Sequence, residues 1–332
     1  MTATAAKNPT LLDITKLLDP DGSVAAVAEI LDESNPILQD ITMVEGNLPT
    51  GHVSTIRTGI PTPTWFQFYG GIQPTKGTTA QVTDQIGMMG AYAEIDYNIA
   101  KLNGNSAAYR LSEDRVHIEG MAQSMAETLF QGNPLVDPTK FLGLNARYND
   151  LSAESADNII DAEGTGVDNA SIWLIGWSPS TIFGIYPKGS EAGLEVTDKG
   201  QVTDTDIDGA GGRGEIYRTH FQWKKGLVVK DWRYAVRIPN IDRSLLTADV
   251  STGANLPNLM FEALDTVPNL ANARFAFYMD KSVLTKLRQQ SEAAIKQSSL
   301  TVDQVGGIPV TSFHGVPIRR TDALAVDEAR IV

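Results

Sequence analysis

The 332-residue sequence contains no cysteine. Disulfide bonds, thiolate catalysis and cysteine-ligated zinc or iron–sulfur sites are therefore excluded. No apolar run approaches the roughly 18–20 residues that a helix needs to span a bilayer. The segment 1–7 lacks the apolar core of a secretory signal peptide. These absences predict a soluble chain that is made in the cytoplasm and has no membrane partner.

Motifs for catalysis and for cofactor binding are also missing. The four histidines, His52, His117, His220 and His314, are far apart, and none has the HExxH spacing of a metal site. The sequence has no GxSxG nucleophile elbow and no GxxxxGK[ST] phosphate loop. We therefore predict no enzyme and no cofactor. An unrecognised hydrolase stays open as an alternative, because sequence alone cannot show which carboxylates pair in space.

Basic residues are scarce relative to acidic ones, with 27 lysines and arginines against 40 aspartates and glutamates, a net charge of -13. This balance disfavours DNA or an anionic membrane as the main ligand, because both require a basic surface. It suits a protein that stays soluble at high copy number and contacts nucleic acid only non-specifically.

The first 44 residues are predicted to form an acidic arm. Apolar residues recur at helical spacing within 11–18 and 24–31, and Asp19-Pro20 and Asn35-Pro36 end the two patterns. Helices this short are not stable alone in water. We expect the arm to lie on a surface that a neighbouring subunit supplies.

Residues 45–105 are predicted to form an extended β-loop. Prolines at 49, 61, 63 and 74 interrupt segments rich in threonine, valine and aromatic residues, which disfavours a central sheet. Residues 93–99 alternate apolar and polar side chains, as a half-buried returning strand does. We predict that the aromatic side chains of this loop contact another subunit, since aromatics anchor interfaces; a local core is the alternative. These side chains are Trp65, Phe66, Phe68 and Tyr69.

A long helix is predicted from about 106 to 132, and Gly132 and Pro134 end it. The remainder mixes strands and helices. Strands are expected at 172–177, 217–224, 227–238 and 274–279 and around 310 and 318, and helices at 256–264 and 282–290.

The segments 217–224 and 227–238 are interpreted as one long hairpin with its turn at 224–226 and its end at Pro239. Aromatics alternate with basic residues here, a pattern that also occurs in single-stranded nucleic-acid binding. We favour a hairpin with two different faces. Arg233 and Arg237 would then point outward and meet acidic surfaces of a neighbouring subunit.

The segment from 204 to 215 matches the calcium-loop pattern D-x-D-x-D-G-x5-E, with Asp204, Asp206, Asp208 and Glu215 as candidate ligands. A calcium-dependent binding module is therefore the alternative function. The flanking residues are not helical, and a solvated acidic turn explains the same residues. The GxGxxG at 209–214 lacks the preceding strand and following helix of a dinucleotide site.

Several stretches, in this order along the chain, resemble the tailed-bacteriophage major capsid proteins of the Hong Kong 97-type fold, in the podophage branch that includes the Bordetella-phage capsid protein. The stretches are Leu48-Pro-Thr-Gly-His-Val53, residues 57–65, residues 126–133, residues 185–194, Tyr217-Arg-Thr-His220, residues 226–234, residues 237–242 and Phe313-His-Gly-Val-Pro-Ile318.

The resemblance implies an α+β fold, with relatives whose strand order is rearranged. It implies an N-terminal arm at 1–44, an extended loop at 45–105, the spine helix of a peripheral domain at 106–140, and an axial domain with the remaining peripheral strands at 141–332. It also implies a virion protein that self-assembles into hexamers and pentamers of an icosahedral head around double-stranded DNA. The short arm leaves no room for a fused scaffold, so a separate scaffolding protein is expected, with a portal and a decoration or cement protein. Lys76 lies in the loop, but no motif supports transfer of the isopeptide cross-linking known in some relatives.

Overall fold

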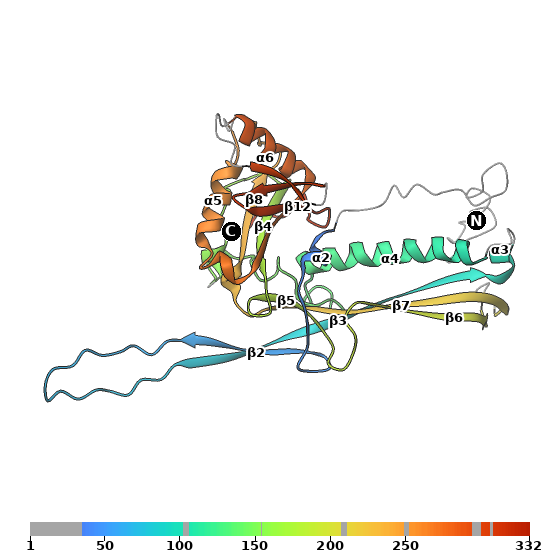
Figure 1. The fold of residues 1–332 in the computed structure, drawn as a ribbon, viewed down its shortest axis with the longest axis horizontal. Helices are drawn as coiled ribbons and strands as arrows, with labels where there is room; N and C mark the ends of the chain where they lie inside the picture. Colours follow the sequence, from blue (N-terminus) through green and yellow to red (C-terminus); the bar gives the residue numbers. More distant parts are fainter. Residues whose placement is uncertain are drawn as a thin grey trace. The chain divides into compact units, whose positions relative to one another are not determined.

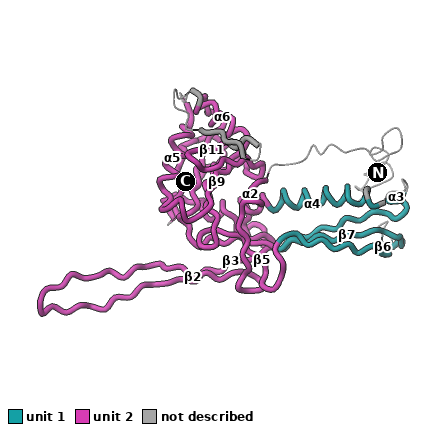
Figure 2. Tube along the Cα trace, in the orientation of Figure 1, with its two compact units in different colours: residues 1–33, 88–125, 193–224 teal, residues 34–87, 126–192, 225–332 magenta. Residues whose placement is uncertain are grey.

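The computed structural model describes residues 35–101, 106–153, 155–206, 211–248, 252–293, 300–305 and 308–332 (Figure 1). The helices predicted within 11–31 lie outside these residues. The described chain combines helices with a mixed sheet, as the α+β prediction expects. It divides into two compact units (Figure 2). Unit 1 takes 88–125 and 193–224 from the described chain, and unit 2 takes 35–87, 126–192 and 225–332.

Unit 1 is built on long strands and one long helix. Its strands come from β3 (Thr78–Asp96), β6 (Leu194–Asp204) and β7 (Gly214–Val229), and β6 pairs antiparallel with β7. After the short helix α3 (Tyr97–Lys101), helix α4 (Ser106–Gln131) confirms the long helix predicted near 106–132. Met121 of α4 packs with Ala93 and Phe221 in a buried cluster, which holds the helix on the strands.

The core of unit 2 surrounds strand β4 (Asn169–Trp177), in which every residue is buried. Its β-branched and aromatic run forms a strand because both faces find apolar partners. β4 pairs antiparallel with β8 (Ala235–Asp242) on one edge and β9 (Arg274–Met279) on the other. The core also contains large aromatic side chains from several elements. They are Phe130, Tyr148, Trp173, Trp177, Phe277 and Tyr278.

The remaining elements of unit 2 extend this sheet and cover it. Strands β1 (Met43–Glu45) and β5 (Ile182–Tyr186) pair in parallel, and β5 pairs antiparallel with the last residues of β7. The other elements of this unit are helices, strands and 3-10 turns. They are α2 (Ile37–Asp40), α5 (Leu256–Thr266), α6 (Lys281–Ala293), β10 (Leu300–Val305), β11 (Ile308–Phe313), β12 (Val316–Arg320) and the 3-10 turns at 156–158, 232–234 and 270–272. The helices predicted near 256–264 and 282–290 and the strands at 172–177, 274–279 and around 310 and 318 are therefore confirmed.

Two strands of unit 2 form a long hairpin (Figure 1). Strand β2 (Gly51–Gly59) pairs antiparallel with the first part of β3, from Gly51 opposite Gln85 to Gly59 opposite Thr78. β2 is the last strand in the sheet order, so one of its edges has no neighbouring strand among the described residues. Residues 60–77 connect the two strands.

The hairpin predicted around 224–226 is wrong, because β7 runs without a break from Gly214 to Val229. The strand changes partner instead of turning: it pairs with β6 up to Trp223 and with β5 from Gly226 onward. This position inside the strand requires glycine, because a Cβ on Gly226 would lie 2.6 Å from the carbonyl oxygen of Gln85. A glycine that permits close backbone contact has the same sequence signature as a turn glycine.

The predicted strand 227–238 is also interrupted. Residues 232–234 form a 3-10 turn, in which the Asp231 carboxylate accepts a hydrogen bond from the backbone N–H of Arg233. β8 then continues through Pro239 to Asp242, so Pro239 does not end it. The pairing of β8 with β4 shifts register between Ala170 and Ile172, which face Ile241 and Ile238. Proline is tolerated at such an irregularity because no ladder donor is required there.

Candidate assembly interface

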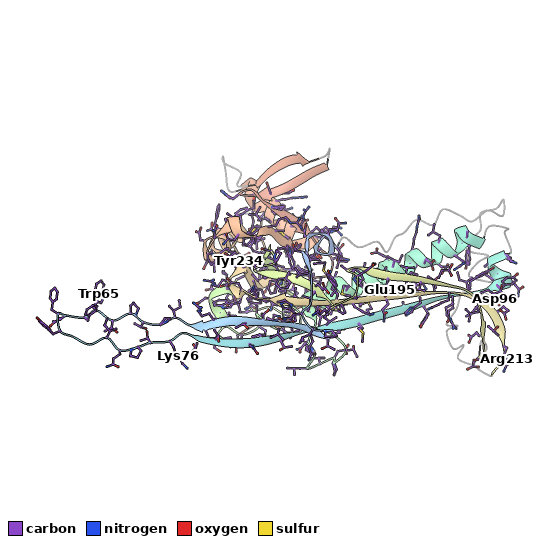
Figure 3. All side chains as sticks on the ribbon, turned by 60° about the horizontal axis from the view of Figure 1, so that its bottom comes forward. Trp65, Lys76, Asp96, Glu195, Arg213 and Tyr234 are labelled. Carbon is purple, nitrogen blue, oxygen red and sulfur yellow. The ribbon has the colours of Figure 1, made fainter. Side chains whose placement is uncertain are left out.

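The connection between β2 and β3 is exposed along its whole length. Every residue from 60 to 83 is exposed, and Trp65 and Phe68 have exposed fractions of 100% and 99%. Phe66 is 62% exposed and Tyr69 is fully exposed. Trp65 stands out from the backbone in Figure 3. The alternative that these aromatics form a local core is therefore wrong.

A tight turn at the end of the hairpin holds Tyr69 in an unfavourable backbone conformation. The N–H of Gly70 donates to the carbonyl oxygen of Gln67 over 2.9 Å. Tyr69, the third residue of this turn, has a φ of 65°, where glycine or asparagine is preferred. A tyrosine here is locally disfavoured and also exposes its ring to water. Folding of the single chain alone does not explain a tyrosine at this position.

The hairpin also differs in charge from the rest of the chain. Between Gly51 and Thr83 the sequence has no aspartate or glutamate, although the chain has 40 of them, and it carries Arg57 and Lys76. The hairpin is thus a weakly basic, aromatic projection from an acidic protein. Its charge and exposed rings fit an acidic, partly apolar surface.

Arg233 and Arg237, the two arginines predicted to face a neighbour, have opposite surroundings. The side chain of Arg233 is 54% exposed and forms an ion pair with Asp231 over 2.8 Å. This carboxylate raises the pKa of the Arg233 guanidinium. Arg237 is only 3% exposed, so the prediction that it points outward is wrong. It cannot contact another subunit while unit 2 is folded.

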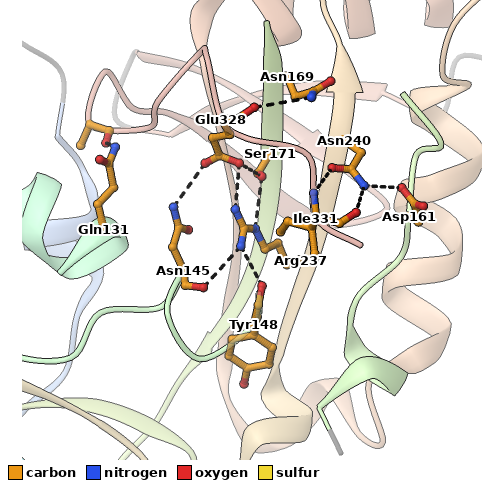
Figure 4. A network of polar contacts seen from close by, with 11 residues as sticks. Gln131, Asn145, Tyr148, Asp161, Asn169, Ser171, Arg237, Asn240, Glu328 and Ile331 are labelled. Carbon is orange, nitrogen blue, oxygen red and sulfur yellow. Dashed lines mark hydrogen bonds and ion pairs between the residues drawn. The ribbon is translucent and has the colours of Figure 1, made fainter. Parts of the chain in front are cut away.

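Arg237 instead forms the centre of a buried polar network (Figure 4). Its guanidinium donates to Oε2 of Glu328 over 2.8 Å and to the carbonyl oxygen of Tyr148 over 2.7 Å. Ser171 donates to the same carboxylate and accepts a 3.2 Å bond from Nε of Arg237. Burial lowers the pKa of Arg237, and the negative charge of Glu328 opposes that shift. The basic residue has a structural partner more than ninety positions away, which alternation along a strand does not reveal.

The same region fixes the end of the chain. Asn240, with a φ of 58°, accepts a hydrogen bond from the N–H of Ile331 through its side-chain oxygen. Its side-chain nitrogen donates to the carbonyl oxygen of Ile331 over 2.9 Å and to Asp161 over 2.8 Å. The backbone of Glu328 also pairs with that of Asn169. Glu328 and Ile331 therefore attach the C-terminal residues to the core of unit 2.

The candidate calcium loop is a strand connection. Asp204 lies opposite Gly214 at the end of the β6–β7 ladder. Glu215 accepts hydrogen bonds from Thr203 and Gln201, which lower the pKa of its carboxyl group. Asp206 accepts from the N–H of Gly211 over 2.6 Å, and Asp208 lies outside the described residues. No group of three or more metal-ligating side chains occurs in the described parts of the chain, so the geometry gives the calcium alternative no support.

The model of the family described as Major capsid protein GP7 matches residues 19–332. The chain belongs to this family. A search of curated protein sequences finds no match.

Solved structures agree with membership of the GP7 family. A chain in the cryo-EM structure of bacteriophage Epsilon15 is 32% identical, with a TM-score of 0.80, and the match covers 100% of this chain and 99% of the other. The bacteriophage JBD30 capsid shows the same fold at 10% identity and a TM-score of 0.50, over 90% of this chain and 95% of the other. The predicted Hong Kong 97-type fold is thus confirmed.

The GP7-family chain is a structural protein of a phage capsid shell, so it self-associates and is located in the virion. Across the described ranges no helix is long and apolar enough to cross a membrane.

Proposed function

We propose that the extended hairpin, above all residues 60–77, joins neighbouring copies of this subunit in the shell. The observation that carries the proposal is the full exposure of Trp65 and Phe68 on a projection without a packing partner among the described residues of its own chain. Backbone groups and rings left in this state gain most from a neighbouring surface. Many moderate contacts, repeated by symmetry, then make a strong shell from weak pairs.

The proposed shell is an icosahedral head of hexamers and pentamers around double-stranded DNA. In this assignment residues 1–44 are the arm and 45–105 the extended loop. Residues 106–140 supply the spine helix of the peripheral domain, and 141–332 supply the axial domain with the remaining peripheral strands. Continuous helix α4 and the long strands β3 and β7 support this assignment.

The proposed partners are further copies of the chain, a separate scaffolding protein, a portal and a decoration or cement protein. The net charge of -13 supports only non-specific contact with the packaged DNA. We further propose that the subunit carries no enzymatic activity and is assembled in the cytoplasm of the bacterial host.

The test replaces residues 60–77 with a two-residue Asn-Gly turn, which joins Gly59 to Thr78 across the β2–β3 ladder. We expect the variant to fold with a thermal midpoint within a few degrees of the parent, because the removed segment has no packing partner in its own described chain. Negative-stain microscopy, with the scaffolding protein supplied, should show at least a tenfold loss of closed shells.

The matched control is Leu270→Ala, which removes an exposed apolar side chain outside the hairpin. It should assemble as the parent does. Normal shells from the shortened hairpin would refute the proposed role.

A further inference from the structure

The hairpin is fixed at its root by one arginine that contacts three separate segments of unit 2. Nη2 of Arg147 lies 2.6 Å from Oδ1 of Asp84 on β3, 3.2 Å from the carbonyl oxygen of Leu227 on β7, and 3.4 Å from that of Leu142 in the segment after α4. The two charged side chains are 14% and 3% exposed. The pair therefore connects the base of the projection to the folded part of the same unit.

The buried polar groups at the root of the hairpin reduce the stability of the folded chain. His52 lies opposite Asp84 in the β2–β3 ladder, and Ser54 follows on the same face. Four buried polar atoms here have no hydrogen-bond partner among the described residues: Nδ1 of His52, Oγ of Ser54, Oδ2 of Asp84 and Nε of Arg147. A buried ion pair often contributes no more stability than apolar side chains of similar size, and unpaired polar atoms reduce its contribution further.

Close backbone contacts at the root leave strands β2 and β3 little freedom to slide against each other or against the rest of unit 2. A Cβ on Gly51 would lie 2.3 Å from the carbonyl oxygen of Asp84, and a Cβ on Gly87 would lie 3.1 Å from the ring of Phe141. The backbones are thus seated closely beside the ion pair. The polar contacts of Arg147 add a directional constraint that apolar packing lacks, because a guanidinium donates along fixed directions.

We propose that Asp84 and Arg147 are a positioning pair that sets the direction of the extended hairpin relative to the rest of unit 2. The direction of the hairpin matters because a small rotation at its root causes a large displacement of its far end. About 15 residues separate Asp84 from Tyr69, and at about 3.3 Å per residue this is about 50 Å, so a rotation of about 10° at the root moves the aromatic end by about 9 Å. That displacement exceeds the size of a side chain, and the rings would miss a fixed neighbouring surface.

This inference rests on the proposed role of the hairpin in assembly, but the direction can be measured without assembly. The chain has no native cysteine, so two introduced cysteines carry spin labels at defined places. Gln73→Cys is exposed far from Asp84 along the hairpin, and Gln289→Cys is exposed on α6 in the same unit. Pulsed electron paramagnetic resonance on unassembled subunits then reports the distribution of distances between hairpin and core.

Two variants remove the constraint in different ways. Asp84→Leu with Arg147→Met replaces both charges by apolar side chains, which usually leaves stability near that of the parent. Arg147→Lys keeps the charge but replaces the planar guanidinium, with its fixed donor directions, by a flexible ammonium group. In both, the distance distribution should become at least twice as wide and closed shells should decrease at least tenfold. Arg320→Ala, which breaks the exposed pair with Asp322, is the matched control and should change neither readout.

A distribution as narrow as that of the parent in the double variant overturns the proposal and leaves the pair a purely structural role. If the double variant does not fold, Arg147→Lys decides in the same way. The replacement of residues 60–77 tests the function of the loop separately. Normal shells from that variant refute the assembly role, whereas the width of the distance distribution still shows whether the pair directs the hairpin.

Discussion

Aromatic side chains occupy two opposite environments within unit 2. Trp173 in β4 is fully buried, and its ring lies 5.6 Å from that of Tyr148 and 6.4 Å from that of Phe130. Trp65 in the extended hairpin is fully exposed. Tryptophan therefore stabilises the folded chain in β4, whereas in the hairpin its ring is free to contact another molecule. Hydrophobicity alone shows that a partner is needed, and the topology shows whether that partner lies in the same chain.

The largest expected effect is on the free energy of unfolding, when Trp173 and Trp65 are each replaced by alanine in separate variants. Trp173→Ala should lower the free energy of unfolding by about 3–5 kcal/mol, because it leaves a cavity in a closed core. Trp65→Ala should change it by less than about 0.5 kcal/mol. Urea unfolding of unassembled subunits measures both values. Equal losses at the two positions would contradict the division into a core and an assembly surface.

A second contrast compares the buried network of Arg237 with an exposed ion pair. Glu328→Ala leaves the guanidinium of Arg237 buried without its carboxylate and should cost about 3 kcal/mol or more. Arg233→Ala breaks the exposed pair with Asp231 and should cost about 0.5 kcal/mol or less. Urea unfolding again provides the measurement. A Glu328→Ala variant as stable as Arg233→Ala would show that the network contributes little.

A smaller effect on stability, but a clear one on assembly, is expected at the turn of the hairpin. Tyr69→Asn introduces a residue that tolerates positive φ and removes the exposed ring. Stability of the unassembled subunit should stay within about 0.5 kcal/mol of the parent, while the yield of closed shells should fall several-fold. Unchanged yields in quantitative negative-stain counts would show that the ring has no role in assembly.

The smallest expected effect is on the pH dependence of folding stability, through His52 at the root of the hairpin. Burial lowers the pKa of His52 below 6.5, with Lys230 adding to the shift and Asp84 opposing it. The unfolded chain therefore binds this proton before the folded chain as pH falls. The stability contribution is present above pH 6.5 and is lost as pH decreases toward the folded-state pKa.

His52→Gln should flatten this part of the pH dependence between about pH 7 and pH 5. Urea midpoints across that range measure it, and Leu270→Ala, which changes no titratable group, is the control that should keep the slope of the parent. Identical pH profiles for the parent and His52→Gln would contradict the prediction.

Local patterns were sufficient for the elements whose partners follow from periodicity. The apolar period and the terminal Gly132 predicted α4, and a continuous run of β-branched and aromatic residues predicted β4. The prolines and aromatics between β2 and β3 predicted an extended segment, because such residues resist placement in a central sheet. Local sequence does not decide whether Trp65 is exposed, because the same residues can surround a tryptophan in a core or on a surface.

The sequence by itself determined the long helix, the buried strand, the extended hairpin and the family resemblance, because each depends on residues that are neighbours along the chain. Only the tertiary structure decided that β7 continues through Gly226, that Arg237 is buried against Glu328, and that Arg147 meets Asp84 at the root of the hairpin. These features depend on pairs separated by about sixty residues or more or on a strand that exchanges partners. Periodicity reports which face of an element is apolar, but it carries no information about which distant group will face a charge.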